Sequence, residues 1–112
     1  MDKNNMQVSV NEVFGLKRAA IEKLEALSLS TLVAKVAVEN AKADAANLSG
    51  WAEQKNDKSR DAYLRLVCET QYNALDKAVE SERAARHELA LVELEVERLR
   101  LIIKINCEWQ EG

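Results

Sequence analysis

The amino-acid sequence predicts an all-α fold, a long antiparallel helical hairpin of coiled-coil-like character. Three observations predict it: two stretches in which apolar residues recur at alternating spacings of three and four, no proline with only three glycines, and one clear turn between the stretches. Alternating spacings of this kind place side chains on one stripe of a helix, along which another helix packs. Proline and glycine usually mark turns between helices or strands, so their scarcity indicates few and long helices or strands.

The first apolar stretch predicts a long helix before the turn. Nine of its eleven positions are apolar, and Lys17 and Thr31 are the exceptions. Gly15 lies within this helix, where glycine costs about 1 kcal/mol relative to alanine. The positions of this first seam are Val13, Lys17, Ala20, Leu24, Leu27, Thr31, Ala34, Val38, Ala41, Ala45 and Leu48.

Capping residues suggest where this helix begins and ends. Ser9 or Asn11 can cap its start, and Glu12 follows Ser9 at the spacing of a capping box. The polar residues 1–8 are then expected to form a flexible leader. Gly50 is expected to end the helix as a C-cap glycine.

A short helix is expected directly after the turn. Asn56 can cap its start, because an asparagine side chain accepts a hydrogen bond from the first helical turn. The apolar repeat of this short helix does not run in step into the next apolar stretch, which predicts a kink between Glu69 and Tyr72, near residue 70. Residues 9–112 are expected to form a single helical-hairpin domain.

The second apolar stretch predicts a final helix that reaches about Asn106. Eight of its nine positions are apolar, and Glu82 is the exception. The positions of this second seam are Leu75, Ala78, Glu82, Ala85, Leu89, Val92, Val96, Leu99 and Ile103. Opposite charges at helical spacing support the same helix. The pairs are Glu80 with Arg83, Glu82 with Arg86, Glu95 with Arg98, and Glu97 with Arg100.

A second apolar row lies to one side of the seam on the final helix, interrupted at Arg98. We call it the outer row, and its members are Leu91, Leu94, Leu101, Ile102 and Ile105. A row of this size left in water forms a patch that monomers usually avoid. It therefore predicts a homo-oligomer, dimer or higher, or docking on another protein. The alternative is that the short helix after the turn folds back over this row.

Aromatic and cationic residues gather around the turn. They are Trp51, Lys55, Lys58, Arg60 and Tyr63, with Arg65 and Tyr72 close by. Aromatics interleaved with cations can stack bases and neutralise phosphates of single-stranded nucleic acid. Nearby carboxylates leave a surplus of only one positive charge, so such binding would be weak and sensitive to salt. The favoured interpretation is that Trp51 and Tyr63 plug the open end of the hairpin.

The sequence offers no convergent set of polar groups from which to build a catalytic site. His87 lies among charged residues, where a solvated surface position is expected rather than a general base. Cys68 and Cys107 are expected to be free thiols, with contact between like cysteines of two chains as the alternative. One histidine and two distant cysteines make a zinc site improbable. We therefore expect no enzymatic activity, catalytic residue, cofactor, metal or small-molecule substrate.

The net charge of -3, with 31% charged residues, indicates a mixed-charge surface without the basic excess of a dedicated duplex-DNA binder. No apolar run is long enough to span a membrane, and the N-terminal residues lack the pattern of a secretory signal. The expected location is therefore the cytoplasm, without membrane association.

Residues 50–105 resemble a loosely defined group of small phage and prophage coiled-coil proteins of unassigned function. The resemblance is carried by Lys55-Asn56, Arg60, Tyr72 with Leu75, and a Glu/Arg/Leu-rich helix ending in Leu99-Arg100-Leu101. It implies an accessory role in a phage or mobile-element context and no catalytic residue.

The sequence thus predicts a non-enzymatic, self-associating helical interaction or scaffolding module. One alternative is an accessory protein that binds single-stranded nucleic acid in recombination or replication. Another is an adaptor or inhibitor that docks on a host protein through the same apolar row.

Overall fold

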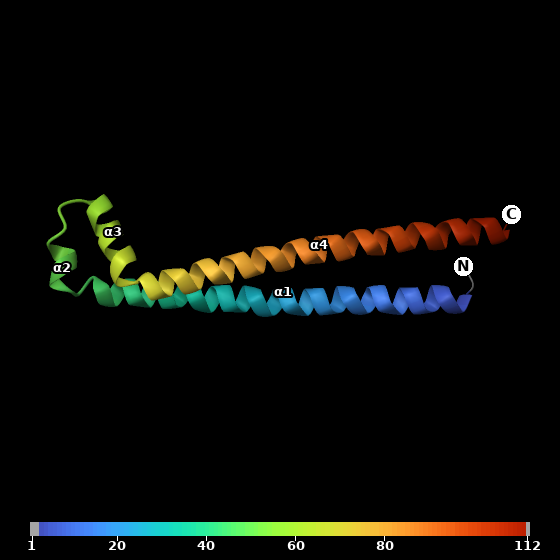
Figure 1. Ribbon diagram of the computed structural model, residues 1–112, viewed down its shortest axis with the longest axis horizontal. Coiled ribbons are helices and arrows are strands. Elements are labelled where there is room, and N and C mark those ends of the chain that lie inside the picture. The colour runs from blue at the N-terminus through green and yellow to red at the C-terminus, as the bar shows by residue number, and fades with distance from the viewer. Residues whose placement is uncertain (1–2, 112) are drawn as a thin grey trace. The chain divides into compact units, whose positions relative to one another are not determined.

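The computed structural model describes the backbone of residues 3–111, and the side chains of all of these except residues 3, 49 and 109–111. The described chain is helical throughout apart from its turns, and no strand occurs within residues 3–111. The helices, labelled in Figure 1, are α1 (Lys3–Ala45), α2 (Ser49–Ala52), α3 (Asp57–Val67) and α4 (Glu69–Glu111). The predicted all-α helical hairpin is therefore confirmed.

The chain forms two compact units, each built from one part of α1 and one part of α4. Unit 1 combines the chain up to Ala26 with the chain from Arg83 onward. Unit 2 is Leu27–Glu82 and also contains α2 and α3. The expectation of a single domain over residues 9–112 stays a prediction.

The two predicted seams form the packed face of the helices in both units. In unit 1 the buried side chains are Ala20, Ala85, Val96 and Leu99. In unit 2 they are Thr31, Val38, Ala45 and Cys68, of which all but Cys68 lie on the first seam. The other seam positions are half-buried, except Leu48, which is exposed. Several of these positions are alanines, whose small side chains allow two packed helices to lie close together.

Two polar positions of the seams, Thr31 and Glu82, are hydrogen-bonded in unit 2. In unit 2 the Ser28 hydroxyl donates a hydrogen bond to Glu82 Oε1 at 3.1 Å. The Thr31 hydroxyl lies 3.0 Å from the carbonyl oxygen of Leu27 and 3.3 Å from that of Ala78. Buried polar groups cost stability unless they are hydrogen-bonded, so these bonds explain how the seam tolerates both residues. A polar layer also favours one register of two packed helices over its neighbours.

Two of the predicted charge pairs are confirmed in unit 1. Arg98 Nε donates to Glu95 Oε2 at 3.3 Å, and Arg100 Nη1 donates to Glu97 Oε1 at 2.8 Å. All four side chains are more than half exposed, so each pair contributes only a few tenths of a kcal/mol, roughly. These pairs therefore support the helix locally and do not determine the fold.

Ion pairs of unit 2 also lie at its surface. Lys42 Nζ donates to Glu39 Oε1 at 3.4 Å, and this hydrogen bond is the main reason that the pKa of Lys42 is raised. Arg65 of α3 donates to Asp76 of α4 at 3.3 Å, which links the two helices on either side of the break between them.

The start of α1 differs from the sequence prediction. The helix begins at Lys3, whereas a cap at Ser9 or Asn11 was expected, so residues 3–8 are helical where a flexible leader was expected. Residues 1–2 lie outside the described part of the chain. Adding a turn to an existing helix requires no new nucleation, so a weak capping signal does not stop the helix from continuing.

The role predicted for Gly50 was wrong. Helix α1 ends at Ala45, and Gly50 lies within α2 without the positive φ of a C-cap glycine. A Cβ added at this position would lie 2.6 Å from Tyr63 Oη and 2.9 Å from two ring carbons. Glycine is therefore needed here because the tyrosine ring of α3 packs directly against the backbone of α2.

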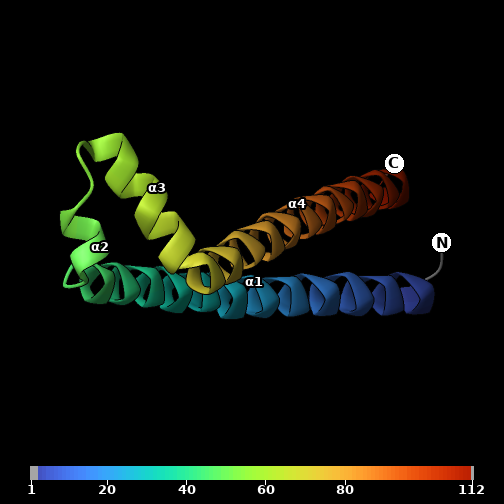
Figure 2. The same ribbon diagram turned by 60° about the vertical axis from the view of Figure 1, so that its left-hand side comes forward.

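The short helix after the turn is confirmed as α3, with its predicted cap. Asn56 has an extended backbone conformation, and its side-chain oxygen accepts a hydrogen bond from the Ser59 amide at 2.8 Å. The break after α3 falls at Cys68, one residue before the predicted interval. Cys68 has φ -100° and ψ 24°, and its side chain is only 1% exposed. Figure 2 shows α3 leaving the direction of α4 at this point.

No helix within residues 3–111 combines the length and the apolar content needed to cross a bilayer.

Candidate protein-interaction site

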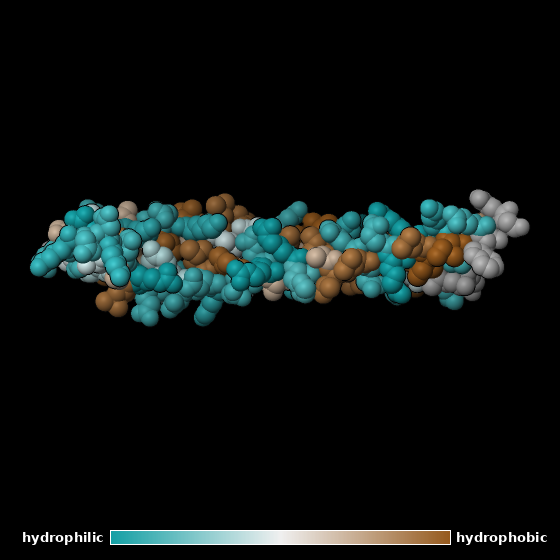
Figure 3. All heavy atoms as spheres, turned by 90° about the horizontal axis from the view of Figure 1, so that it is seen from above, coloured by the Kyte–Doolittle hydropathy of each residue, from teal (hydrophilic) through white to brown (hydrophobic). Residues whose placement is uncertain are grey.

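The outer row is exposed on α4 in unit 1. Leu94 and Leu101 are 66% and 60% exposed, Leu91 and Ile105 are 51% and 52% exposed, and Ile102 is half-buried. Apolar groups reach the surface between hydrophilic ones in the space-filling view (Figure 3). Exposed leucines are common singly, whereas several on one face of a helix form an apolar patch of the kind that monomers usually avoid.

Helical periodicity places the outer row on the side of α4 that faces away from the seam. Leu91, Leu94, Arg98, Leu101 and Ile105 follow one another at spacings of three, four, three and four. This is the same repeat as the seam, displaced around the helix. A helix with two such stripes has one face for its hairpin partner and another for a further helix.

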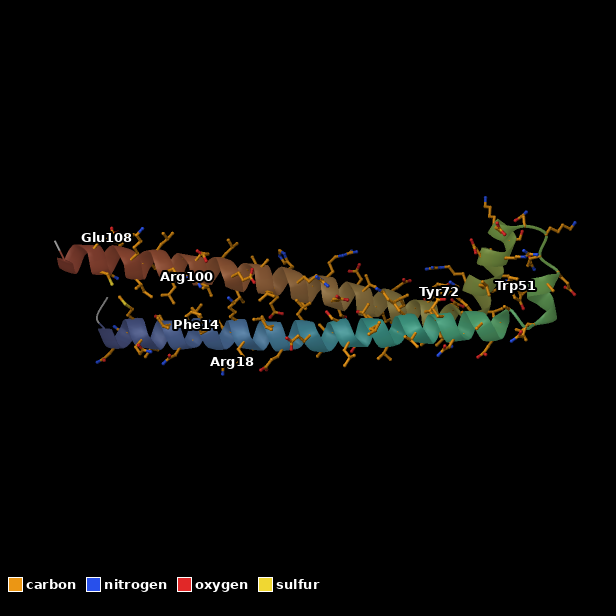
Figure 4. The ribbon with its side chains drawn as sticks, turned by 180° about the vertical axis from the view of Figure 1, so that it is seen from behind. Phe14, Arg18, Trp51, Tyr72, Arg100 and Glu108 are labelled. Atoms are coloured by element: carbon orange, nitrogen blue, oxygen red, sulfur yellow. The ribbon has the colours of Figure 1, made fainter. Side chains whose placement is uncertain are left out.

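Charged side chains border this row. Arg98 interrupts it and is held by Glu95 at 3.3 Å, and Glu97 lies on one edge with Arg100 bonded to it at 2.8 Å. Lys104 lies on the same edge as Glu97 and is exposed. Figure 4 labels Arg100 on this part of α4. An apolar centre with a charged border is the usual anatomy of a protein-binding surface.

A groove of unit 1 lies beside the outer row. Leu94 lines it together with Glu93, Glu97 and Arg100 from α4 and with Lys17 from α1. Lys17 is half-buried at its seam position, as its long aliphatic stem allows.

Helix α3 belongs to unit 2 and the outer row to unit 1, so the alternative in which the short helix covers this row stays a prediction. This helix packs against α2 within unit 2.

The turn residues singled out from the sequence are only partly brought together. Trp51 of α2 lies beside α3, where the guanidinium carbon of Arg60 is 4.8 Å from the centre of the indole ring (Figure 4). Tyr63 packs on α2 at Gly50, whereas Lys55 and Lys58 are exposed on the loop and the first turn of α3.

This arrangement is better suited to holding α2 against α3 than to stacking a base. Arg60 covers one face of Trp51 in a cation–π contact, so a base could stack on that face only by displacing it. Arg65 covers the Tyr72 ring in the same way at 4.7 Å. Trp51 Nε1 and Arg60 Nε are buried and have no hydrogen-bond partner within the described residues. The cluster therefore has a packing role within unit 2.

The remaining titratable side chains that the structure describes include one histidine and two cysteines. His87 is exposed on α4. Cys68 is buried and Cys107 is exposed. Among residues 3–111, no three side chains of the metal-binding types come together.

A second exposed apolar surface, on α1 in unit 2, was not predicted from the sequence. Its members are Leu29, Leu32, Val33 and Val36, between 51% and 62% exposed. Leu29, Val33 and Val36 follow one another at spacings of four and three, so the same periodicity could have found them. They lie opposite the first seam, as the outer row lies opposite the second.

Comparisons with protein-family models, with curated proteins and with solved structures gave no match.

Proposed function

We propose that this protein is a non-enzymatic helical module that associates with itself through the outer row of α4. The observation that carries the proposal is the exposure of four large aliphatic side chains at the repeat of a helix-packing stripe. Burying such side chains stabilises an assembly by about 25 cal/mol for each Å² of apolar surface removed from water.

A second helix is the occupant that this geometry favours. The spacings of three and four along the row match the pattern with which one helix packs on another. A flat or irregular partner surface would not require this repeat. The charged border would keep the unassociated protein in solution and orient the partner.

Solution mass tests the proposal. Light scattering coupled to size exclusion, across a concentration series, should give a mass well above the 12.6 kDa of one chain. Leu94→Asp should weaken association by roughly 30-fold or more, because it removes about 2 kcal/mol of apolar burial and introduces a charge into the row.

Leu66→Asp is a matched control. Leu66 is 72% exposed on α3, so the substitution is chemically identical but lies outside the outer row, and it should leave the mass unchanged. A monomer at every concentration for the unaltered protein would refute the proposal, as would equal effects of the two substitutions.

A further inference from the structure

The border of the outer row carries two opposite charges on the same edge. Glu97 immediately precedes Arg98 of the row, and Lys104 immediately precedes Ile105. Both side chains are exposed and lie seven residues apart, at equivalent heptad positions. Two like edges meet when identical helices pack antiparallel, so the edge is complementary to itself.

We propose that a second copy binds the outer row antiparallel, in the one register that pairs Glu97 with the partner's Lys104. This inference rests on the proposed self-association and assigns its geometry. The two-fold axis would pass between Arg98 and Leu101. Leu94 would then lie opposite the partner's Ile105, and Arg98 opposite the partner's Leu101.

The charge pairing follows from this register. When Arg98 lies opposite the partner's Leu101, the edge residue before Arg98 faces the edge residue before the partner's Ile105. Glu97 therefore faces the partner's Lys104, and the two-fold axis repeats the pair with the roles exchanged. Two symmetry-related ion pairs thus lie along the same edge of the apolar contacts.

The neighbouring registers bring like charges together. Sliding one copy by seven residues in one direction places Glu97 against the partner's Glu97 and Glu95 against the partner's Glu95. Sliding it in the other direction places Lys104 against the partner's Lys104. Like charges across a helix interface select against a register, so these alternatives are disfavoured.

A parallel arrangement is disfavoured by Arg98. It would place Arg98 directly against the partner's Arg98 in the middle of the apolar row. In the antiparallel register the aliphatic part of Arg98 packs on the partner's Leu101, while its guanidinium stays with Glu95, to which it is bonded at 3.3 Å. The residue that interrupts the row is thereby accommodated.

Charge reversal tests this register. Glu97→Lys and Lys104→Glu should each weaken self-association by about tenfold, because each turns two attractive pairs into repulsive ones. The double variant should return to within about twofold of the unaltered protein. Within one chain the two positions are about 10.5 Å apart along the helix, so recovery reports a contact between copies.

Lys77→Glu is the control, since Lys77 is exposed on α4 outside the outer row and should leave association unchanged. Mass by light scattering and the dissociation constant by analytical ultracentrifugation are the measurements. The register is wrong if the double variant associates as weakly as either single variant, or if the single variants associate normally. The proposed function still stands in that case, provided that Leu94→Asp disrupts association. If the unaltered protein is a monomer, both proposals fail.

Discussion

Replacing each of the two described glycines with alanine should have opposite effects on stability. Gly15 and Gly50 both lie in helices, but a Cβ added at Gly15 meets nothing within 4 Å, whereas one added at Gly50 meets the Tyr63 ring. Alanine is favoured over glycine in a helix by about 1 kcal/mol. Gly15→Ala should therefore raise the free energy of unfolding by about 1 kcal/mol.

At Gly50 the same gain is outweighed by overlap with Tyr63. The 2.6 Å and 2.9 Å separations are too short for nonbonded carbon and oxygen atoms, so the ring must move. Such overpacking costs about 1–3 kcal/mol. The expected net result of Gly50→Ala is a loss of about 1 kcal/mol, which leaves the two variants about 2 kcal/mol apart.

Thermal unfolding followed by circular dichroism measures this difference. With about 4 °C for each kcal/mol in a chain of this size, the two midpoints should differ by about 8 °C. A Tyr63→Ala background should abolish the loss at Gly50, because the overlapping ring is then absent. Equal stabilisation by both alanine substitutions would refute the packing argument for Gly50.

Two further predictions concern the cap of α3 and the seam. Asn56→Ala should destabilise α3 by about 1 kcal/mol and speed amide exchange at Ser59, whereas Asn56→Asp should preserve both, because aspartate also accepts the capping hydrogen bond. Unchanged exchange at Ser59 in the alanine variant would contradict this reasoning. Val96→Ala should cost about 1–3 kcal/mol in a denaturant titration, since Val96 is 3% exposed and its loss leaves a cavity. Val36→Ala, at an exposed position, should change stability by less than about 0.5 kcal/mol. Similar losses for Val96→Ala and Val36→Ala would contradict the placement of Val96 in the second seam.

Much of the hairpin could be predicted because it depends on local periodicity. Every position of the second seam is buried or half-buried, including Glu82, whose carboxylate accepts a hydrogen bond from Ser28. The break after α3 was also foreseen to within a residue, because a change in apolar phase shows where one helix cannot simply continue into the next. Exposure of the outer row was predictable for the same reason.

The ends of the elements were predicted less well. The cap expected at Ser9 is weak compared with the tendency of a helix to extend, and α1 begins at Lys3. The sequence indicated a structural role for Gly50, but the role assigned was wrong. A glycine before a turn has the pattern of a C-cap in any sequence. Only the position of Tyr63, thirteen residues later, shows that the requirement is space.

The sequence by itself determined the helical class, the two seams and the exposed apolar row, since each follows from the spacing of residues along one helix. Tertiary structure decided what lies opposite each position: the Ala78 carbonyl that accepts a hydrogen bond from the Thr31 hydroxyl, the arginine over Trp51, and the ring that excludes a side chain at Gly50. These contacts join residues that are distant along the chain, and periodicity within one helix carries no information about which atoms a neighbouring helix brings to it.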